Sequence, residues 1–289
     1  MSVFKKATKF QSFLKMGLIG PAGAGKTYTA LTVGKTLVEN TGKRIAVIDT
    51  EHGSSSKYSD IFDFDMVELE DFNPQNYIDV IQAAEKEGFG VLIIDSLSHA
   101  WSGKGGALEM VEKAKQRSPS HNSFAAWRDV TPLHNRLIDS IVSARIHIIV
   151  TFRSKTEYVI EQDDRGKQQV RKVGLAPVFR DGAEYEFDVV ADMDQENTLV
   201  VTKSRCPTIS NEVIKKPGKE LGETLLTWLS GAPKPEVPQD YSETLDTDKP
   251  CPKCDGPMEI VQGIFKGKPF KGERCTSKGC GFKRQLELS

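Results

Sequence analysis

The sequence has 289 residues, of which 38% are hydrophobic and 27% are charged, and its formal net charge is -1. This composition excludes a chain that is disordered throughout, and the length predicts one large domain with a small additional unit. No apolar run is long enough for a secretion signal or a membrane span, so we expect a cytosolic protein without membrane partners.

The first half of the chain alternates short apolar runs with amphipathic segments. We expect strands over 13–19, 44–49, 66–69, 89–95 and 146–152. Helices are expected over 26–39, 74–86 (with Asn73 as N-cap), 107–116 and 124–144. This alternation predicts an α/β fold with a mostly parallel, doubly wound sheet.

The pattern changes after Arg153. Two antiparallel edge hairpins are predicted, one pairing 157–160 with 169–173 around a turn at 163–167, the other pairing 184–191 with 198–203. A last helix is expected over 221–229. Residues 231–248 are rich in proline and acidic residues and predict an extended linker, so the expected parts are 1–230, 231–248 and 249–289.

Residues 20–27, GPAGAGKT, fit the pattern G-x-x-x-x-G-K-[ST] between an expected strand and an expected helix. Such glycines let consecutive backbone N–H groups point toward phosphate oxygens, beside the positive end of the helix. We therefore predict an ATP site in which Lys26 reaches the β and γ phosphates and Thr27 ligates Mg²⁺. The other predicted nucleotide contacts are Gly20, Pro21, Ala22, Gly23, Ala24, Gly25 and Tyr28.

Two carboxylates follow expected parallel strands, at the edge of the sheet where ligands of such folds bind. Asp95 ends the run VLIID and is predicted to hold Mg²⁺. The next residue is Ser96, whereas many AAA-type ATPases place their catalytic glutamate at this point. The base that activates water is therefore expected elsewhere, and Glu51 is the candidate. The alternatives are an Asp95 that caps a turn and a Glu51 that is a surface acid.

Glu51 lies in IAVIDTEHGSS (45–55), which resembles a stretch of RecA-type recombinases in which the glutamate polarises the attacking water. A wider set of segments resembles the phage RecA-like ATPases associated with single-strand annealing and recombination: IDSLSHAW (94–101), AWRDVTPLHNRLIDSI (126–141), TFRSKTEYV (151–159), GLAPVFRDGAEYEFDVV (174–190) and TKSR (202–205). This resemblance, over residues 12–230, implies a RecA-like P-loop NTPase that hydrolyses ATP and acts with single-stranded DNA, beside a single-strand-binding protein.

Three basic residues are further catalytic candidates. Arg153 follows the strand 146–152 and either senses the γ phosphate or pairs with a neighbouring acid. Lys203 and Arg205 share one face of an expected edge strand. The resemblance implies that they reach the nucleotide of the next subunit in a homo-oligomeric ring or filament, and the alternative is a solvated strand face.

Residues 153–180 contain seven Lys/Arg and four Asp/Glu, at the place where RecA-type proteins contact DNA. The resulting net charge of about +3 is modest for phosphate binding, so an exposed hairpin without a nucleic-acid role is the alternative. Phe124 and Trp127 either stack on bases or pack in the core, and core packing is the expected role.

Four of the five cysteines lie close together near the C-terminal end, as Cys251, Cys254, Cys275 and Cys280. Their spacing predicts a small zinc ribbon with a closed, structural Zn²⁺ site, with disulfides or free thiols as the alternative. Basic and aromatic residues between the two pairs suit nucleic acid or an acidic partner segment. Cys206 stands apart and is expected to pack as a small hydrophobic residue.

These features together predict Mg²⁺-dependent ATP binding and hydrolysis coupled to recombination, annealing or repair of single-stranded DNA. The main alternative is a nucleotide-switched module that binds DNA or loads a partner with little turnover. A small-molecule kinase is less favoured because no motif for an acceptor-binding lid is present.

Overall fold

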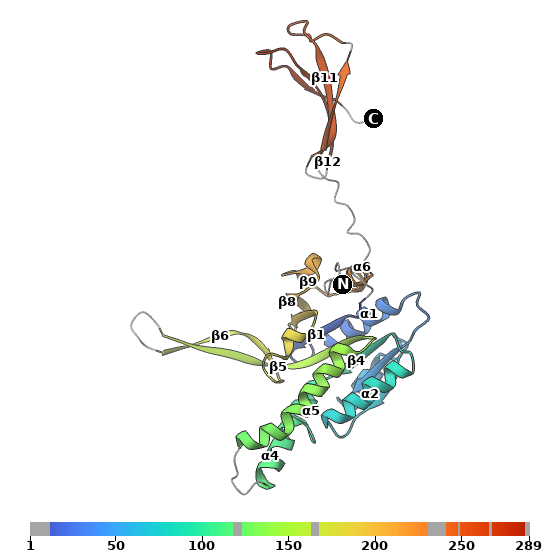
Figure 1. The fold of residues 1–289 in the computed structure, drawn as a ribbon, viewed down its shortest axis with the longest axis vertical. Helices are drawn as coiled ribbons and strands as arrows, with labels where there is room; N and C mark the ends of the chain where they lie inside the picture. The colour runs from blue at the N-terminus through green and yellow to red at the C-terminus, as the bar shows by residue number, and fades with distance from the viewer. Residues whose placement is uncertain are drawn as a thin grey trace, which may run out of the picture. The chain divides into compact units, whose positions relative to one another are not determined.

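The computed structural model describes residues 12–117, 123–162, 168–230, 241–247, 249–265 and 268–286. The chain divides into two compact units, Met1–Gly231 and Ala232–Ser289 (Figure 1). The expected turn at 163–167 lies outside the described residues.

The first unit is built on one large sheet with the strand order β3-β2-β4-β5-β1-β7-β8-β9. All neighbours from β3 to β7 are parallel, and β8 and β9 are antiparallel additions at one edge. The strands are β1 (Lys15–Gly20), β2 (Ile45–Asp49), β3 (Asp65–Glu68), β4 (Val91–Asp95), β5 (His147–Gln162), β6 (Gln168–Pro177), β7 (Val189–Met193), β8 (Thr198–Ser204) and β9 (Val213–Lys215).

Helices cover both faces of this sheet, because successive side chains of its buried strands point to opposite sides. On β4, Val91 and Ile93 face one core and Leu92 and Ile94 face the other. The helices are α1 (Lys26–Val38), α2 (Pro74–Lys86), α3 (Ser98–Ser102), α4 (Ala107–Arg117), α5 (Ser123–Ser143) and α6 (Lys219–Leu229). Helices α1 and α6 pack on the first core, whereas α2 and α5 pack on the second.

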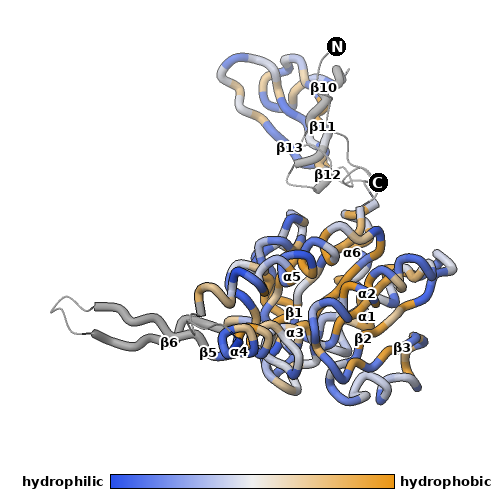
Figure 2. The backbone as a smooth tube through the Cα atoms, turned by 60° about the horizontal axis from the view of Figure 1, so that its bottom comes forward, coloured by the Kyte–Doolittle hydropathy of each residue, from blue (hydrophilic) through white to orange (hydrophobic). Residues whose placement is uncertain are grey.

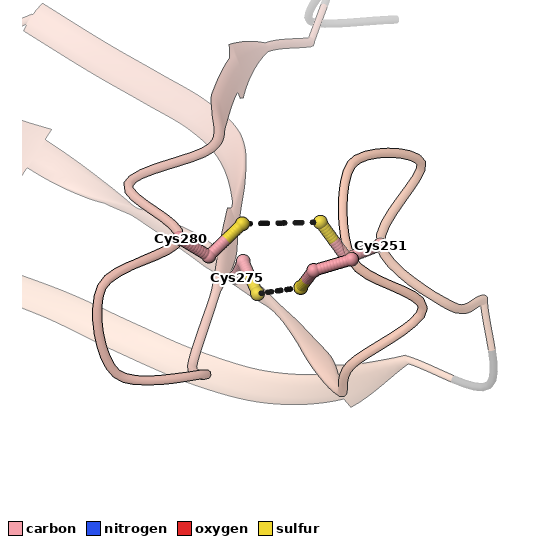
Figure 3. Close-up of side chains that lie close together, drawn as sticks. Cys251, Cys275 and Cys280 are labelled. Atoms are coloured by element: carbon pink, nitrogen blue, oxygen red, sulfur yellow. Dashed lines mark hydrogen bonds between the residues drawn. The ribbon is translucent and has the colours of Figure 1, made fainter.

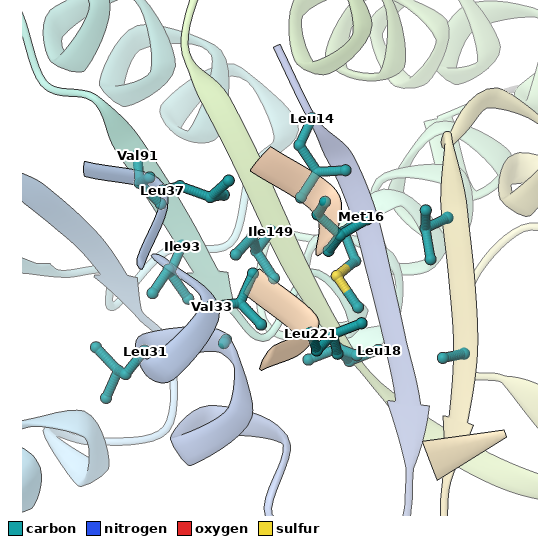
Figure 4. Packing of buried hydrophobic residues seen from close by; sticks show 14 of the residues in the cluster. Leu14, Met16, Leu18, Leu31, Val33, Leu37, Val91, Ile93, Ile149 and Leu221 are labelled. Carbon is teal, nitrogen blue, oxygen red and sulfur yellow. The ribbon is translucent and has the colours of Figure 1, made fainter. Parts of the chain in front are cut away.

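Met16 and Leu18 of β1, with Leu14 just before the strand, belong to the first core together with Val33 and Leu37 of the covering helix α1 (Figure 4). Hydrophobic residues concentrate along the central strands of the first unit, such as β1 and β2, whereas its helices mix hydrophobic and hydrophilic residues (Figure 2). Cys206 belongs to the same core and is fully buried, which confirms its expected role as a small hydrophobic residue. The predicted fold class, α/β with a mostly parallel sheet and antiparallel edge hairpins, is confirmed.

Most expected elements are present with small shifts at their ends. Asn73 caps α2 as predicted, because its side chain accepts a hydrogen bond of 2.9 Å from the backbone N–H of Gln75. The short helix α3 was not expected, and β9 rather than β8 forms the edge of the sheet. The stretch 184–191, expected as one strand, divides into a 3₁₀ turn (Ala183–Glu186, η2) and β7, because Gly182 in the left-handed region starts a turn there.

Strand β5 is longer than expected. It continues through Arg153 as one strand of 16 residues and leaves the sheet to pair with β6 in a long antiparallel hairpin (Figure 1). A register shift lies between Glu157 and Tyr158. The first predicted hairpin is therefore present, as a direct extension of a central strand of the sheet.

The second unit is an antiparallel sheet in the order β10-β11-β12-β13. Its strands are β10 (Tyr241–Thr247), β11 (Met258–Phe265), β12 (Lys268–Cys275) and β13 (Lys283–Gln285). Residues 241–247 were expected in the linker, but every one of them pairs with a residue of β11. Proline and acidic residues earlier in the segment 231–248 concealed the alternating pattern of YSETLDT, which suits a strand.

Candidate active site

The loop between β1 and α1 has a shape that only glycine permits at three positions. Gly23 and Gly25 have φ values of 81° and 79°, in the left-handed region that disfavours other residues. A Cβ on Gly25 would lie 2.5 Å from Oδ1 of Asn197, and one on Gly20 would lie 2.5 Å from the carbonyl oxygen of Met193. The loop is therefore held closely against the turn between β7 and β8.

Lys26 begins α1 and turns its side chain back over this loop. Its Nζ donates hydrogen bonds of 2.9 Å to the carbonyl oxygen of Gly20 and 2.8 Å to that of Pro21. Burial lowers the pKa of Lys26, and the nearby carboxylates of Asp95 and Glu51 oppose this effect. The ammonium group is thus placed across the cradle formed by the loop, where a phosphate would bind.

Asp95 ends β4 and is nearly fully buried beneath the loop. The hydroxyl of Thr27 donates to its Oδ2 at 2.6 Å, and the hydroxyl of Thr151 on β5 donates to its Oδ1 at 2.6 Å. Burial raises the pKa of Asp95, while the two hydroxyl donors act to lower it. Thr27 and Asp95 together provide the hard oxygen ligands that suit Mg²⁺, so the residues present fit the predicted metal site.

Glu51 lies in a loop that Asp49 organises. The buried carboxylate of Asp49, at the end of β2, accepts hydrogen bonds from the backbone N–H groups of Glu51 at 2.7 Å, Gly53 at 3.2 Å and Ser55 at 2.8 Å. Three such bonds fix the loop backbone, so the Glu51 side chain starts from a defined position. The role of Asp49 is therefore to position the backbone of Glu51.

A second contact ties this loop to the end of β4. The backbone N–H of Thr50 donates to the carbonyl oxygen of Asp95 at 2.8 Å, and the Thr50 hydroxyl accepts from the N–H of Ser96 at 2.8 Å. Nδ1 of His99 lies 2.6 Å from the same hydroxyl, and its ring stacks on Phe72. Desolvation by burial lowers the pKa of His99. The two acid-bearing loops are thus joined directly.

Arg153 forms an ion pair with Glu51. Its Nε donates to Oε1 at 2.8 Å and its Nη2 donates to Oε2 at 2.5 Å. The hydrogen bonds and charge of Glu51 raise the pKa of Arg153. Of the two alternatives that the sequence left open for Arg153, pairing with a neighbouring acid is the one present in the structure.

These groups line one pocket of about 1220 Å³ at the carboxyl ends of the parallel strands. Its lining includes every residue from Gly20 to Tyr28, together with Glu51, Asp95 and Arg153. Two further segments line the pocket and were not anticipated, because they match no motif: the turn between β7 and β8, and the residues between β9 and the start of α6. The lining residues from these segments are Asn197, Lys216, Pro217, Gly218 and Lys219.

Tyr28 lines the pocket with an exposed ring that makes edge contacts with Tyr58, at 6.0 Å between centroids, and with Phe62, at 5.3 Å. Tyr58 also lines the pocket. Aromatic edges and faces of this kind can border a nucleotide base. The sequence predicted Tyr28 from its place after the loop but gave no signal for Tyr58.

Lys203 and Arg205 are not part of this pocket. Because β8 runs antiparallel to β7, they lie near the amino end of β7, away from the loop. Nζ of Lys203 donates to backbone carbonyl groups of η2 and of the residue after it, with the Phe187 oxygen at 2.6 Å. Arg205 pairs with Asp188 at 2.9 Å, and its side chain is 55% exposed.

The aromatic residues near the start of α5 have different surroundings. The ring of Trp127 stacks on Trp101 at 5.4 Å between centroids and packs against the small core formed by α4 and α5. Phe124 is 85% exposed. Core packing therefore describes Trp127 but not Phe124.

The four clustered cysteines converge in the second unit, where their sulfur atoms all lie within 4.8 Å of one another (Figure 3). Sγ of Cys251 lies 3.7 Å from Cys280, and Sγ of Cys254 lies 3.6 Å from Cys275. Sulfurs bound to one tetrahedral Zn²⁺ at about 2.3 Å lie about 3.8 Å apart, whereas a disulfide requires about 2.05 Å. The cluster is compatible with zinc and does not consist of disulfides.

The sequence matches the AAA domain family over residues 12–216, which includes the loop, both acids and Arg153. The chain belongs to the AAA domain family. This AAA domain protein is therefore a P-loop NTPase, and the predicted fold class and enzyme class agree with that membership. No curated protein matches the chain.

Two solved structures are similar to this AAA domain protein. The KaiC-like protein PH0186 from Pyrococcus horikoshii OT3 has 15% sequence identity and a TM-score of 0.39, covering 74% of this chain and 97% of its own. The genome packaging NTPase B204 from Sulfolobus turreted icosahedral virus 2, in complex with sulfate, has 15% identity and a TM-score of 0.35, covering 62% of this chain and 74% of its own. Among the described residues, no helix combines the length and apolar character required to cross a membrane.

Proposed function

We propose that this AAA domain protein binds and hydrolyses ATP with Mg²⁺ and that hydrolysis serves transactions on single-stranded DNA. One observation carries the hydrolytic part: Lys26, Thr27, Asp95 and Glu51 line the same pocket at one edge of the sheet. Had Glu51 or Asp95 pointed away from Lys26, the pocket would hold a phosphate without the groups that act on it.

Each side chain has a role that follows from its position. The N–H groups of residues 20–27 and the ammonium of Lys26 would bind the β and γ phosphates. Thr27 and Asp95 would hold Mg²⁺, which supplies positive charge to the phosphate oxygens when bound. Glu51 would accept a proton from the attacking water, because its carboxylate borders the phosphate cradle and its backbone is fixed by Asp49.

The hairpin β5–β6 supports the DNA part of the proposal. It extends the strand that carries Arg153, so it is continuous with the pocket, and the segment 153–180 has an excess of basic residues. The resemblance to phage RecA-like ATPases supplies the substrate class, single-stranded DNA, and the partner class, a single-strand-binding protein. Phosphate contacts from basic side chains would make such binding sensitive to salt.

Assembly into a ring or filament is part of the same proposal. Arg205 lies at the end of the sheet opposite to the loop, so within one chain it does not reach the pocket. In a head-to-tail assembly it would approach the γ phosphate bound by a neighbouring copy, and added positive charge there favours phosphoryl transfer. Lys203 would contribute by holding η2 in place.

The four cysteines would bind one structural Zn²⁺ in the second unit. Backbone N–H groups donate to two of the sulfurs, from Lys253 to Cys251 at 3.5 Å and from Ser277 to Cys275 at 3.4 Å. Such donors stabilise thiolates in metal sites. The unit would then serve as an accessory surface for nucleic acid or for a partner protein.

The test replaces Glu51 with Gln, which keeps the size of the side chain and removes the basic carboxylate. We expect phosphate release to fall at least about 100-fold while ATP still binds. Phosphate release should be measured by a coupled assay, with and without a single-stranded oligonucleotide, and ATP binding by titration calorimetry. Asp65→Asn, at an exposed ion pair with Arg44 on the edge strand, is the matched control.

The result separates the two functions. Loss of turnover in Glu51→Gln together with loss of DNA-dependent activity supports an enzyme. If the wild-type protein binds ATP and DNA but Glu51→Gln keeps its full DNA-dependent activity, the protein is a nucleotide-switched module that does not need hydrolysis to act. Phosphate release that requires an added small-molecule acceptor would indicate a kinase and contradict both.

A further inference from the structure

The pair between Glu51 and Arg153 conflicts with the role of Glu51 as a base. Each oxygen of the carboxylate accepts a hydrogen bond from the guanidinium, Oε1 from Nε and Oε2 from Nη2. The Glu51 side chain is 28% exposed and the Arg153 side chain 52%. A carboxylate whose two oxygens are both held in this way has little freedom to orient an attacking water.

Arg153 has a second possible partner in the same pocket. Its guanidinium borders the space above the loop, together with Lys26 and Asp95. Phosphate and carboxylate groups both bind guanidinium through two parallel hydrogen bonds, so they compete for the same donors. A γ phosphate carries more charge than a carboxylate, whereas a diphosphate has no γ group to offer Arg153, and its β phosphate would be bound by the loop and Lys26.

We propose that Arg153 is a latch. By this we mean a positioning residue whose guanidinium binds Glu51 until the γ phosphate of a bound nucleoside triphosphate replaces Glu51 as the partner of that guanidinium. The exchange frees the Glu51 carboxylate for water only when a triphosphate is bound, so the site distinguishes triphosphate from diphosphate before hydrolysis begins. This inference rests on the proposed ATPase function and adds the control of its base.

The backbone of Arg153 is fixed on both sides, so that only the side chain needs to move. Its N–H donates to Oγ of Ser98 at 3.0 Å, and its carbonyl oxygen accepts from the N–H of Val178 at 2.7 Å. The next residue, Ser154, begins the pairing with β6 at Pro177. The latch therefore stands at the root of the hairpin, where a ligand on β5–β6 has a direct path to it.

The test is a double-mutant cycle on nucleotide affinity. Glu51→Gln removes the charge that binds Arg153, so a non-hydrolysable triphosphate with Mg²⁺ should bind about fivefold more tightly, a value in the upper range for a partly exposed ion pair. ADP affinity should change less than about twofold. In the Arg153→Ala background the Glu51→Gln substitution should no longer alter triphosphate affinity, because no latch remains to be opened.

Equal tightening by Glu51→Gln with and without Arg153 would overturn the latch, because it would reflect only the removal of negative charge near phosphate. Equal tightening for ADP and the triphosphate would overturn it as well. Failure of the wild-type protein to bind either nucleotide would instead overturn the proposed function. Circular dichroism checks the folding of each variant. If Arg153→Ala does not fold, Arg153→Gln replaces it, because glutamine also removes the positive charge that binds Glu51. Asp65→Asn is the control for loss of a remote ion pair.

Discussion

In the first unit, burial and hydrogen bonding set the protonation of single side chains, some in the pocket and some with a purely structural role. Asp95 and Lys26 lie in the pocket, where burial disfavours both charges and each partly compensates the other. His147 illustrates a purely structural case. Its Nδ1 accepts a hydrogen bond of 2.9 Å from the backbone N–H of Leu14, which requires the imidazole to be neutral at that nitrogen.

The stability of the first unit should fall below pH 6.5 because of this residue. Burial, with the positive charge of Lys15 and Lys43 added to it, lowers the pKa of His147 from 6.5 to about 4. Between these values the unfolded chain binds the proton more strongly, so protonation favours unfolding. We expect the contribution of His147 to fall by about 1–2 kcal/mol between pH 7 and pH 5, measured by urea unfolding at both values.

His147→Asn keeps an acceptor near the Leu14 N–H but does not titrate, so it should reduce this loss. Some loss should remain, because burial also lowers the pKa of His134 to about 4. The matched control is His52→Asn, at an exposed histidine with a φ of 55° that asparagine tolerates. Identical pH dependence in wild type and His147→Asn would refute the assignment.

Elements determine where these residues meet. The loop 20–27 gains its shape from β1 and α1, and the loop that carries Glu51 gains its shape from Asp49 at the end of β2. In the second unit, the hairpins bring two distant cysteine pairs together, and the residues whose burial is described include few buried hydrophobic side chains, Cys251 and Met258. A sheet of this size depends on an additional constraint for stability.

Removal of one sulfur should therefore unfold the second unit. Cys275→Ser leaves three thiolates, and we expect loss of bound zinc, measured by metal analysis of the purified protein, and loss of protection of β11 and β12 in hydrogen exchange. The control is Cys206→Ser, which changes a cysteine in the core of the first unit. The protein with this substitution should retain zinc in the second unit. Full zinc content and unchanged protection in Cys275→Ser would contradict a four-cysteine site.

At the scale of the whole molecule, the order of strands separates the loop from Arg205. β1 and β7 are parallel, and at their carboxyl ends Gly20 and the turn after β7, with Asn197, line the pocket, whereas Arg205 lies beside Asp188 at the amino end of β7. A residue that acts on phosphate from that position requires a second copy of the chain. The cysteine site belongs to the second compact unit, which has a sheet of its own.

Mixing two inactive variants tests action between copies. Arg205→Ala keeps an intact loop, and Lys26→Ala keeps an intact Arg205, so each should hydrolyse ATP at least about 10-fold more slowly than wild type. Mixed in equal amounts, they should recover part of the wild-type rate, with assembly followed by sedimentation. A mixture of Arg205→Ala with the double variant Lys26→Ala/Arg205→Ala should not recover, and absence of recovery in both mixtures would refute the proposal.

The sequence by itself determined the elements with strong local patterns. The phosphate loop, Asp95 at the end of an apolar strand and the cysteine pairs follow from residue types at fixed spacing, because backbone shape and metal geometry require those types there. Glu51 was predicted from the resemblance of residues 45–55 to RecA-type recombinases. Tertiary structure alone decided which distant groups meet. The Glu51–Arg153 pair, the lining of the pocket by Asn197 and residues 216–219, and the burial of Thr151 against Asp95 depend on the order of strands in the sheet. Contacts across 50 or more residues leave no local pattern.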